Sequence, residues 1–199
     1  MGLFPIFSTR VLPTFLESVK GCGKPAILDI GPVIGHNIEF LLGRGMKVYV
    51  EDVLTDWEEL NERRIGADDT PLPVGEYLEK QLAYPTGFFD GILCRDTLDG
   101  LDPPSSRLLI RQLHGILKHG GPILALFGGG ERWSDRRAKS VITDGGPRKS
   151  RWPSTSRPYH QYENRHIHDL FSNFGSAHSY LLGNGIRAIL CRKEAPSAA

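Results

Sequence analysis

Two patterns of apolar and polar residues alternate along the chain: short apolar runs, which are typical of buried strands, and stretches typical of amphipathic helices. This alternation predicts strands separated by helices. Short runs rich in apolar and β-branched residues predict four strands in the first two thirds of the chain, at 26–30, 47–52, 88–94 and 122–127. Apolar residues on one face predict helices at 11–20 and 37–42, and a charged, helix-prone stretch predicts one at 54–64. Further helices are expected at 76–82 and, after the turn at 101–104, at 106–117. Such alternation is typical of a doubly wound α/β sheet, mostly parallel and Rossmann-like, with helices on both faces.

The last third of the chain departs from this alternation. Residues 131–157 show no periodicity and carry eight basic residues against three acidic ones, which predicts a basic loop or lid inserted into the fold. Order returns in the segment 158–193, where a helix and two strands are expected at 164–174, 177–182 and 186–192. The Gly-Asn-Gly turn at 183–185 separates the two strands and predicts a C-terminal antiparallel β-hairpin.

Length and composition fit one domain. The chain has 199 residues, of which 40% are hydrophobic and 24% charged, so it can bury a core of its own. We therefore expect a single domain over 1–199, made of a lead-in helix, a cofactor-binding core, the basic insertion and the C-terminal helix and hairpin, at 11–24, 26–127, 131–157 and 158–193. The net charge of +1 predicts no strong overall field, so any preference for an anionic partner must come from a local patch.

Metal, disulfide and membrane signals are weak in this sequence. The three cysteines lie far apart without a Cys-x-x-Cys pair, which argues against a disulfide framework and a zinc site. His166 and His168 are two positions apart and would face different sides of a helix, so no metal is expected. The chain shows no leader pattern and no apolar run of about 18 residues. These features predict a cytoplasmic protein without a membrane partner, and they leave its oligomeric state open.

Candidate chemistry gathers in the strand, turn, helix and strand of residues 26–52. A turn containing Gly31 and Gly35 joins the first strand to the next helix, and such a turn lets a ligand approach the backbone beside the N–H groups of the helix. The second strand finishes in Glu51 and Asp52, and an acid there can accept both hydrogen bonds from a ribose diol. This unit predicts a site for a nucleotide-like ligand.

The run ILDIGPVIG at 27–35 resembles the first motif of the class I S-adenosylmethionine-dependent methyltransferases, with Asp29, Gly31 and Gly35 at matching positions. The segments 84–101 and 113–126 resemble the later motif segments of the family in the right order, and the resemblance covers about 26–193. It implies methyl transfer from S-adenosylmethionine, with Asp29 as an organiser of the glycine turn. The residues that it implies for the cofactor are Asp29, Gly31, Gly35, Asn37, Glu51, Asp52, Gln81, Cys94 and Arg95. Between the two acids, the alternation of Val48 and Val50 favours Asp52 for the ribose.

Two positions depart from the family pattern. Val33 replaces the middle glycine of the motif, and its branched side chain narrows the space for the methionine part of the cofactor. Where the family has an acid at the end of its third strand, this sequence offers only Gln81. A Rossmann dehydrogenase is the nearest rival, but the Gly-x-Gly-x-x-Gly spacing fails after Gly31.

No strong catalytic signature is present, and none is needed for direct in-line transfer of a methyl group between two positioned reactants. Weak candidates for an acid or base are Tyr159 and His160, with Arg95 beside the fourth predicted strand. The Asn/Asp-Pro-Pro-aromatic motif of amino-group nucleic-acid methylases is missing, because Ser105 follows Asp102-Pro103-Pro104. We therefore expect a small-molecule methyl acceptor.

Two other functions stay open. A catalytically silent protein could keep the methyltransferase fold as a binding or interaction module, which Val33 and Gln81 favour. A nucleic-acid methyltransferase or binder could use the basic segment 131–157, where Trp133 and Trp152 lie among arginines and could stack on bases.

Overall fold

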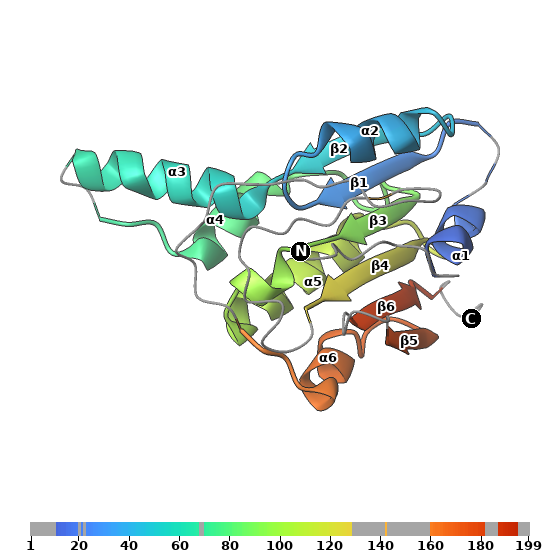
Figure 1. Cartoon of the computed structure of the whole chain (residues 1–199). Helices are drawn as coiled ribbons and strands as arrows, with labels where there is room; N and C mark the ends of the chain where they lie inside the picture. The colour runs from blue at the N-terminus through green and yellow to red at the C-terminus, as the bar shows by residue number, and fades with distance from the viewer. Residues whose placement is uncertain are drawn as a thin grey trace, which may run out of the picture.

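A six-stranded sheet lies at the centre of the fold, with its strands in the order β2-β1-β3-β4-β6-β5 (Figure 1). The computed structural model describes residues 11–19, 21, 23–67, 70–128, 142, 160–181 and 187–194. The strands are β1 (Ala26–Ile30), β2 (Lys47–Glu51), β3 (Gly91–Cys94), β4 (Pro122–Phe127), β5 (Ala177–Leu181) and β6 (Arg187–Arg192). The first four are parallel, whereas β6 runs antiparallel to β4 and to β5. The predicted mostly parallel sheet with a C-terminal antiparallel pair is confirmed.

Helices cover both faces of this sheet (Figure 1). They are α1 (Val11–Ser18), α2 (Gly35–Leu42), α3 (Val53–Gly66), α4 (Val74–Gln81), α5 (Pro103–Ile116) and α6 (Asn164–Leu170), with a 3-10 turn, η1 (Leu98–Gly100). On one face, α1 and α2 share a hydrophobic cluster with Ile27 of β1. On the other face, α3 to α6 share a cluster with Leu28 of β1. Successive residues of β1 are buried on opposite faces, which explains its unbroken apolar run. None of the described helices is both long and apolar enough to cross a bilayer.

The expected elements form close to their predicted bounds, with differences at the ends. The strand expected at 88–94 is shorter, because Phe89 makes only an isolated bridge to Leu117 before β3 begins. The last helix ends at Leu170 instead of 174 and is followed by turns. The 183–185 turn lies outside the described residues, although the two strands beside it pair as expected.

Gln81 lies at the end of a helix and not at the end of a strand. It is the last residue of α4, whose Tyr77 and Leu78 are buried at helical spacing against the core. Within the described stretches 23–67 and 70–128, no strand follows β2 before β3, so β2 has a sheet neighbour only in β1. The segment is rich in Glu, Lys and Gln, which favour helix over strand.

The carboxyl ends of the parallel strands meet at one edge of the sheet. The chain leaves β1 toward one side of the sheet, to β2, and leaves β3 toward the other side, to β4. The gap between β1 and β3 is therefore the topological switch point, where doubly wound folds bind their ligands. The turn after β1, the loop after β3 and Gly128 after β4 all lie at this edge.

Candidate functional site

Gly31 fixes the path of the turn after β1. Its φ angle is 147°, and a Cβ built on it would lie 2.3 Å from the backbone oxygen of Arg95, in the loop after β3. Its N–H donates to the backbone oxygen of Glu51 at 3.0 Å. Gly31 thus lets the ends of β1, β2 and β3 come together. The space that a side chain would need here is filled by the protein's own backbone, at Arg95.

At the start of α2, in contrast to Gly31, the space beside the backbone is open. A Cβ on Gly35, the first residue of the helix, would meet no atom within 4 Å. Nε2 of the next residue, His36, is buried and has no hydrogen-bond partner in the described structure. The first N–H groups of a helix also lack partners within it. Val33 is 51% exposed, so its side chain narrows the approach from solvent and does not fill the core.

Asp29 and Arg95 form a buried ion pair at the switch point. The Arg95 Nε and one terminal nitrogen donate to the two carboxylate oxygens of Asp29, at 2.6 and 2.7 Å, and both side chains are 1% exposed. The same nitrogen donates to the Pro32 oxygen at 3.1 Å. Burial alone would lower the pKa of Arg95, but Asp29 holds that pKa above its usual value. The Asp29 carboxylate thus organises the glycine turn through Arg95.

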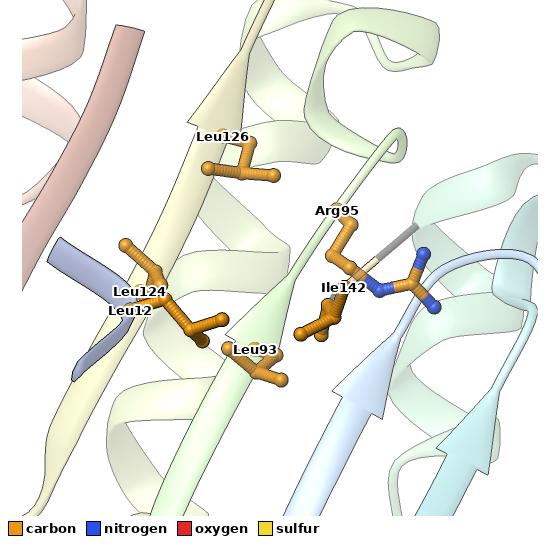
Figure 2. Close-up of a pocket in the computed structure, with 6 residues that line it drawn as sticks. All are labelled: Leu12, Leu93, Arg95, Leu124, Leu126 and Ile142. Carbon is orange, nitrogen blue, oxygen red and sulfur yellow. The ribbon is translucent and has the colours of Figure 1, made fainter. Parts of the chain in front are cut away.

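Asn37 is buried in the first turn of α2 and is tied to a distant part of the chain. Its Oδ1 accepts from the N–H of Ile142 at 2.7 Å. Figure 2 shows Ile142 beside Leu93, with Arg95 at the end of β3 and its guanidinium turned toward the end of β1. The cavity that these three residues line with Leu12, Leu124 and Leu126 measures only about 10 Å³, too little for a ligand, so it is a packing gap.

Glu51 and Asp52, the two acids after β2, have different environments. Asp52 is the N-cap of α3, with Oδ1 accepting from the Thr55 N–H at 3.3 Å. Glu51 accepts from Gln81 Nε2 at 3.1 Å and from the hydroxyl of Tyr84. Burial and the hydrogen bond to Glu51 raise the pKa of Tyr84. Both carboxylate oxygens of Glu51 thus accept a hydrogen bond from a side chain, whereas Asp52 caps a helix through Oδ1.

Cys94 lies too deep for its side chain to reach a ligand. It ends β3 and is fully buried in the cluster beneath α3 to α6. Burial is the main cause that raises the pKa of its thiol. Only the backbone of Cys94 can take part in a site at the sheet edge.

Asp99 lies at the same edge, and the sequence reasoning missed it. It belongs to η1 and is 5% exposed. Its Oδ2 accepts from the N–H of Gly128, after β4, at 2.7 Å, and its backbone oxygen accepts from the N–H of His160 at 2.8 Å. Its Oδ1 is buried without a partner in the described structure. The only sequence signal was its position a few residues beyond a buried strand.

Several predictions from the sequence fall outside what the structure describes. Tyr159 and, apart from Ile142, the basic segment 131–157 are among them, so their proposed roles remain predictions. Of the catalytic candidates, His160 reaches Asp99 through its backbone, and Arg95 is committed to Asp29. In the described part of the chain, no group of three or more His, Cys, Asp or Glu side chains could hold a metal.

Two wider hollows lie away from this edge. One, of about 430 Å³, is lined by α1 and the segment that leads into β1, at the opposite ends of the strands. The other, of about 300 Å³, lies between α6 and β5. Neither touches the glycine turn, Glu51 or Asp99, so their size alone does not make them the functional site.

Comparison with solved structures identifies proteins of the same fold, whereas comparison by sequence finds no match. No protein-family model matches the chain, and no curated protein does. A SAM-dependent methyltransferase from Archaeoglobus fulgidus is similar in structure, with a TM-score of 0.60 and 14% identity over 92% of both chains. So is the 1,6-didemethyltoxoflavin-N1-methyltransferase of Burkholderia thailandensis, solved with 1,6-didemethyltoxoflavin and S-adenosylhomocysteine, with a TM-score of 0.55 and 17% identity over 94% of this chain and 76% of that one.

Human N-acetylserotonin methyltransferase, solved with S-adenosylmethionine, gives a TM-score of 0.51 at 19% identity, over 93% of this chain and 51% of that one. At these identities the likeness establishes the fold, which is that of class I S-adenosylmethionine-dependent methyltransferases.

Proposed function

We propose that this protein binds S-adenosylmethionine at the switch point between β1 and β3 and transfers its methyl group to a small molecule. The observation that carries the proposal is the start of α2, where a Cβ on Gly35 would meet empty space and the Nε2 of the next residue, His36, is buried without a partner in the described structure. A buried polar atom without a partner is rare and needs an explanation. A ligand seated on the glycine turn would supply one.

The residues present fit the nucleoside end of this cofactor. Glu51 offers a carboxylate at the end of β2, whose two oxygens accept from Gln81 and Tyr84 and can each accept a second hydrogen bond. The glycine turn leads into the N-terminus of α2, which carries the positive end of the helix dipole. The methionine end of the cofactor would be bound in another way than the family motif implies. The Asp29 carboxylate is taken by Arg95, so the cofactor carboxylate is left to the positive end of α2 and the cofactor ammonium to backbone oxygens at the ends of the strands.

The chain's own residues would act mainly by positioning. S-adenosylmethionine, when bound, supplies an electrophilic methyl group on a sulfonium. The Asp29–Arg95 pair and Gly31 hold the ends of β1 and β3 in fixed register, so the wall behind the cofactor is rigid. Rigid placement of two reactants lowers the barrier by avoiding the entropy cost of bringing them together. Residues after β3 and β4 would face the acceptor.

Glu51→Ala should weaken binding of S-adenosylhomocysteine about tenfold to a hundredfold, since hydrogen bonds to a charged group contribute about 1.5–3 kcal/mol. Isothermal titration calorimetry measures this directly. Asp52→Ala is the matched control from the adjacent position. It removes an N-cap and should cost about 1 kcal/mol of stability with little change in affinity. The reverse pattern would assign the ribose to Asp52.

A silent binding module is the second candidate, and the Asp29–Arg95 pair favours it, because the chain itself neutralises the acid of its glycine motif. Calorimetry separates the two candidates. No heat and no thermal shift with millimolar S-adenosylmethionine or S-adenosylhomocysteine would overturn the enzyme proposal. Binding of both ligands without methyl transfer to any of a panel of phenols, amines and thiols would favour the silent module.

A further inference from the structure

Asp99 is a buried carboxyl group that the fold does not fully use. One oxygen holds the N–H of Gly128, and the other, Oδ1, has no partner in the described structure. Leaving a buried polar atom unsatisfied costs about 1–3 kcal/mol. The hydrogen bond to Gly128 uses only one of the two carboxyl oxygens, so that bond alone does not explain a carboxyl group at this buried position.

The position of Asp99 is that of an acceptor-binding group. It lies between the ends of β3 and β4, joined to Gly128 after β4, while the glycine turn lies on the other side of β3. A ligand on the glycine turn therefore has Glu51 at one end of the site and the loop of Asp99 toward the other. Acid and base groups of doubly wound enzymes come from such strand ends.

Burial of Asp99 favours its neutral form. Burial raises its pKa to about 8, the Gly128 N–H lowers it in part, Asp96 raises it further and Arg187 lowers it. Burial raises the pKa of Tyr162 and Asp99 raises it further, whereas the hydrogen bond to Ser106 lowers it. The Tyr162 hydroxyl is hydrogen-bonded to Ser106 and to the backbone oxygen of Leu101. His160 approaches through its backbone. A carboxyl group of this kind changes protonation in the pH range where enzymes work.

We propose that Asp99 faces the methyl acceptor and receives the proton that the acceptor loses. The acceptor is then a hydroxyl or an amine that carries a hydrogen. Its oxygen or nitrogen gains the methyl group while the carbon–sulfur bond breaks and leaves its electron pair on sulfur, and the acceptor proton passes to Oδ1 of Asp99. The inference rests on the proposed function.

The positive charge of the sulfonium favours transfer of the acceptor proton to Asp99. A nearby positive charge favours the ionised form of a carboxyl group. Bound S-adenosylmethionine therefore makes Asp99 ready to accept a proton, and the neutral thioether of S-adenosylhomocysteine lets Asp99 keep it. A carboxyl group with a purely structural role, remote from the methyl group, would not distinguish the two ligands.

The test follows the protonated carboxyl band of Asp99 by infrared difference spectroscopy, wild type minus Asp99→Asn, against pH. We expect a midpoint near 8 for the free protein, about the same with S-adenosylhomocysteine, and about one pH unit lower with S-adenosylmethionine. The asparagine keeps an acceptor for the Gly128 N–H. Asp102→Asn, which retains the cap of α5 and removes a nearby carboxyl group, is the control and should leave the difference between the two ligands unchanged.

Calorimetry on the same samples tells the two proposals apart. Binding of both ligands with equal midpoints overturns the role of Asp99 and leaves the proposed function standing. If neither ligand binds, both proposals fail. If both ligands bind and the midpoints differ as expected, methyl transfer is measured with a panel of phenols and amines. Asp99→Asn should then turn over about a hundredfold more slowly than wild type, or slower still. Its affinity for S-adenosylhomocysteine should be unchanged.

The free energy of unfolding gives an independent readout. A carboxyl group whose pKa is raised in the folded state stabilises the fold most below its unfolded pKa, near 4. That contribution is lost as pH rises toward the folded value of about 8. Wild-type thermal stability should therefore fall more steeply than that of Asp99→Asn between pH 5 and 8. Parallel curves would show that Asp99 has no raised pKa and would overturn its proposed role.

Discussion

Arg95→Met should lower the free energy of unfolding by about 3–5 kcal/mol, because it leaves the Asp29 carboxylate buried without its partner. Both side chains are 1% exposed, and two short hydrogen bonds join them. Urea denaturation followed by circular dichroism measures the loss. Arg63→Met is the control, since Arg63 pairs with Glu59 at 77% and 57% exposure. Removal of an exposed pair should cost less than about 1 kcal/mol.

A double variant shows whether the loss comes from charge or from packing. Asp29→Asn with Arg95→Met removes both charges and keeps side chains of similar size. Because a buried pair replaced by neutral groups is often no less stable, we expect the double variant to recover more than half of the lost stability. Equal losses in the single and double variants would mean that the shape of Arg95 matters and its charge does not.

Gly31→Ala should be the second most damaging change, at about 2–4 kcal/mol, because it adds a left-handed backbone cost to a steric clash. The new Cβ would lie 2.3 Å from the Arg95 backbone oxygen, at a φ of 147°. Backbone cannot move aside as a flexible side chain can. The turn must shift, and binding of S-adenosylhomocysteine should be lost with it. Urea denaturation and calorimetry on one preparation measure both effects.

Gly35→Ala is the matched control from the same motif. Its Cβ would meet nothing within 4 Å, and its φ is not in the left-handed region. Stability should stay within about 1 kcal/mol of wild type, because alanine is accepted in a helix. Affinity should nevertheless fall if a ligand fills that space. Unchanged affinity would place the ligand elsewhere.

The backbone of the site could be predicted from sequence because its signals are local. The apolar run of β1, the glycines after it and the second strand lie within 26–52, and the structure forms β1, α2 and β2 there. The shift of the start of α2 to Gly35 is an ordinary boundary error. The choice between Glu51 and Asp52 could not be made from spacing alone, because both helix capping and ribose binding use an acid at that place.

The contacts that define the site are long-range, and the sequence gives no sign of them. Arg95 is 66 positions from Asp29, and nothing local to either residue indicates that they meet. Asp99 was missed because its distinguishing properties are its burial and its partnerless oxygen. Both properties arise because β3 and β4 bring the segments that follow them together. The periodicity of apolar residues in the sequence does not indicate such a contact.

The bond between Asn37 and Ile142 has a consequence for how the site assembles. The two residues are 105 positions apart. During synthesis the chain can complete β1, α2 and β2 long before Ile142 is made, so the hydrogen bond from the Ile142 N–H to Asn37 Oδ1 forms late. Closure of so long a loop is slow compared with local folding. Nascent chains that end before residue 142 should therefore have a folded strand–helix–strand unit whose ligand site is not yet complete.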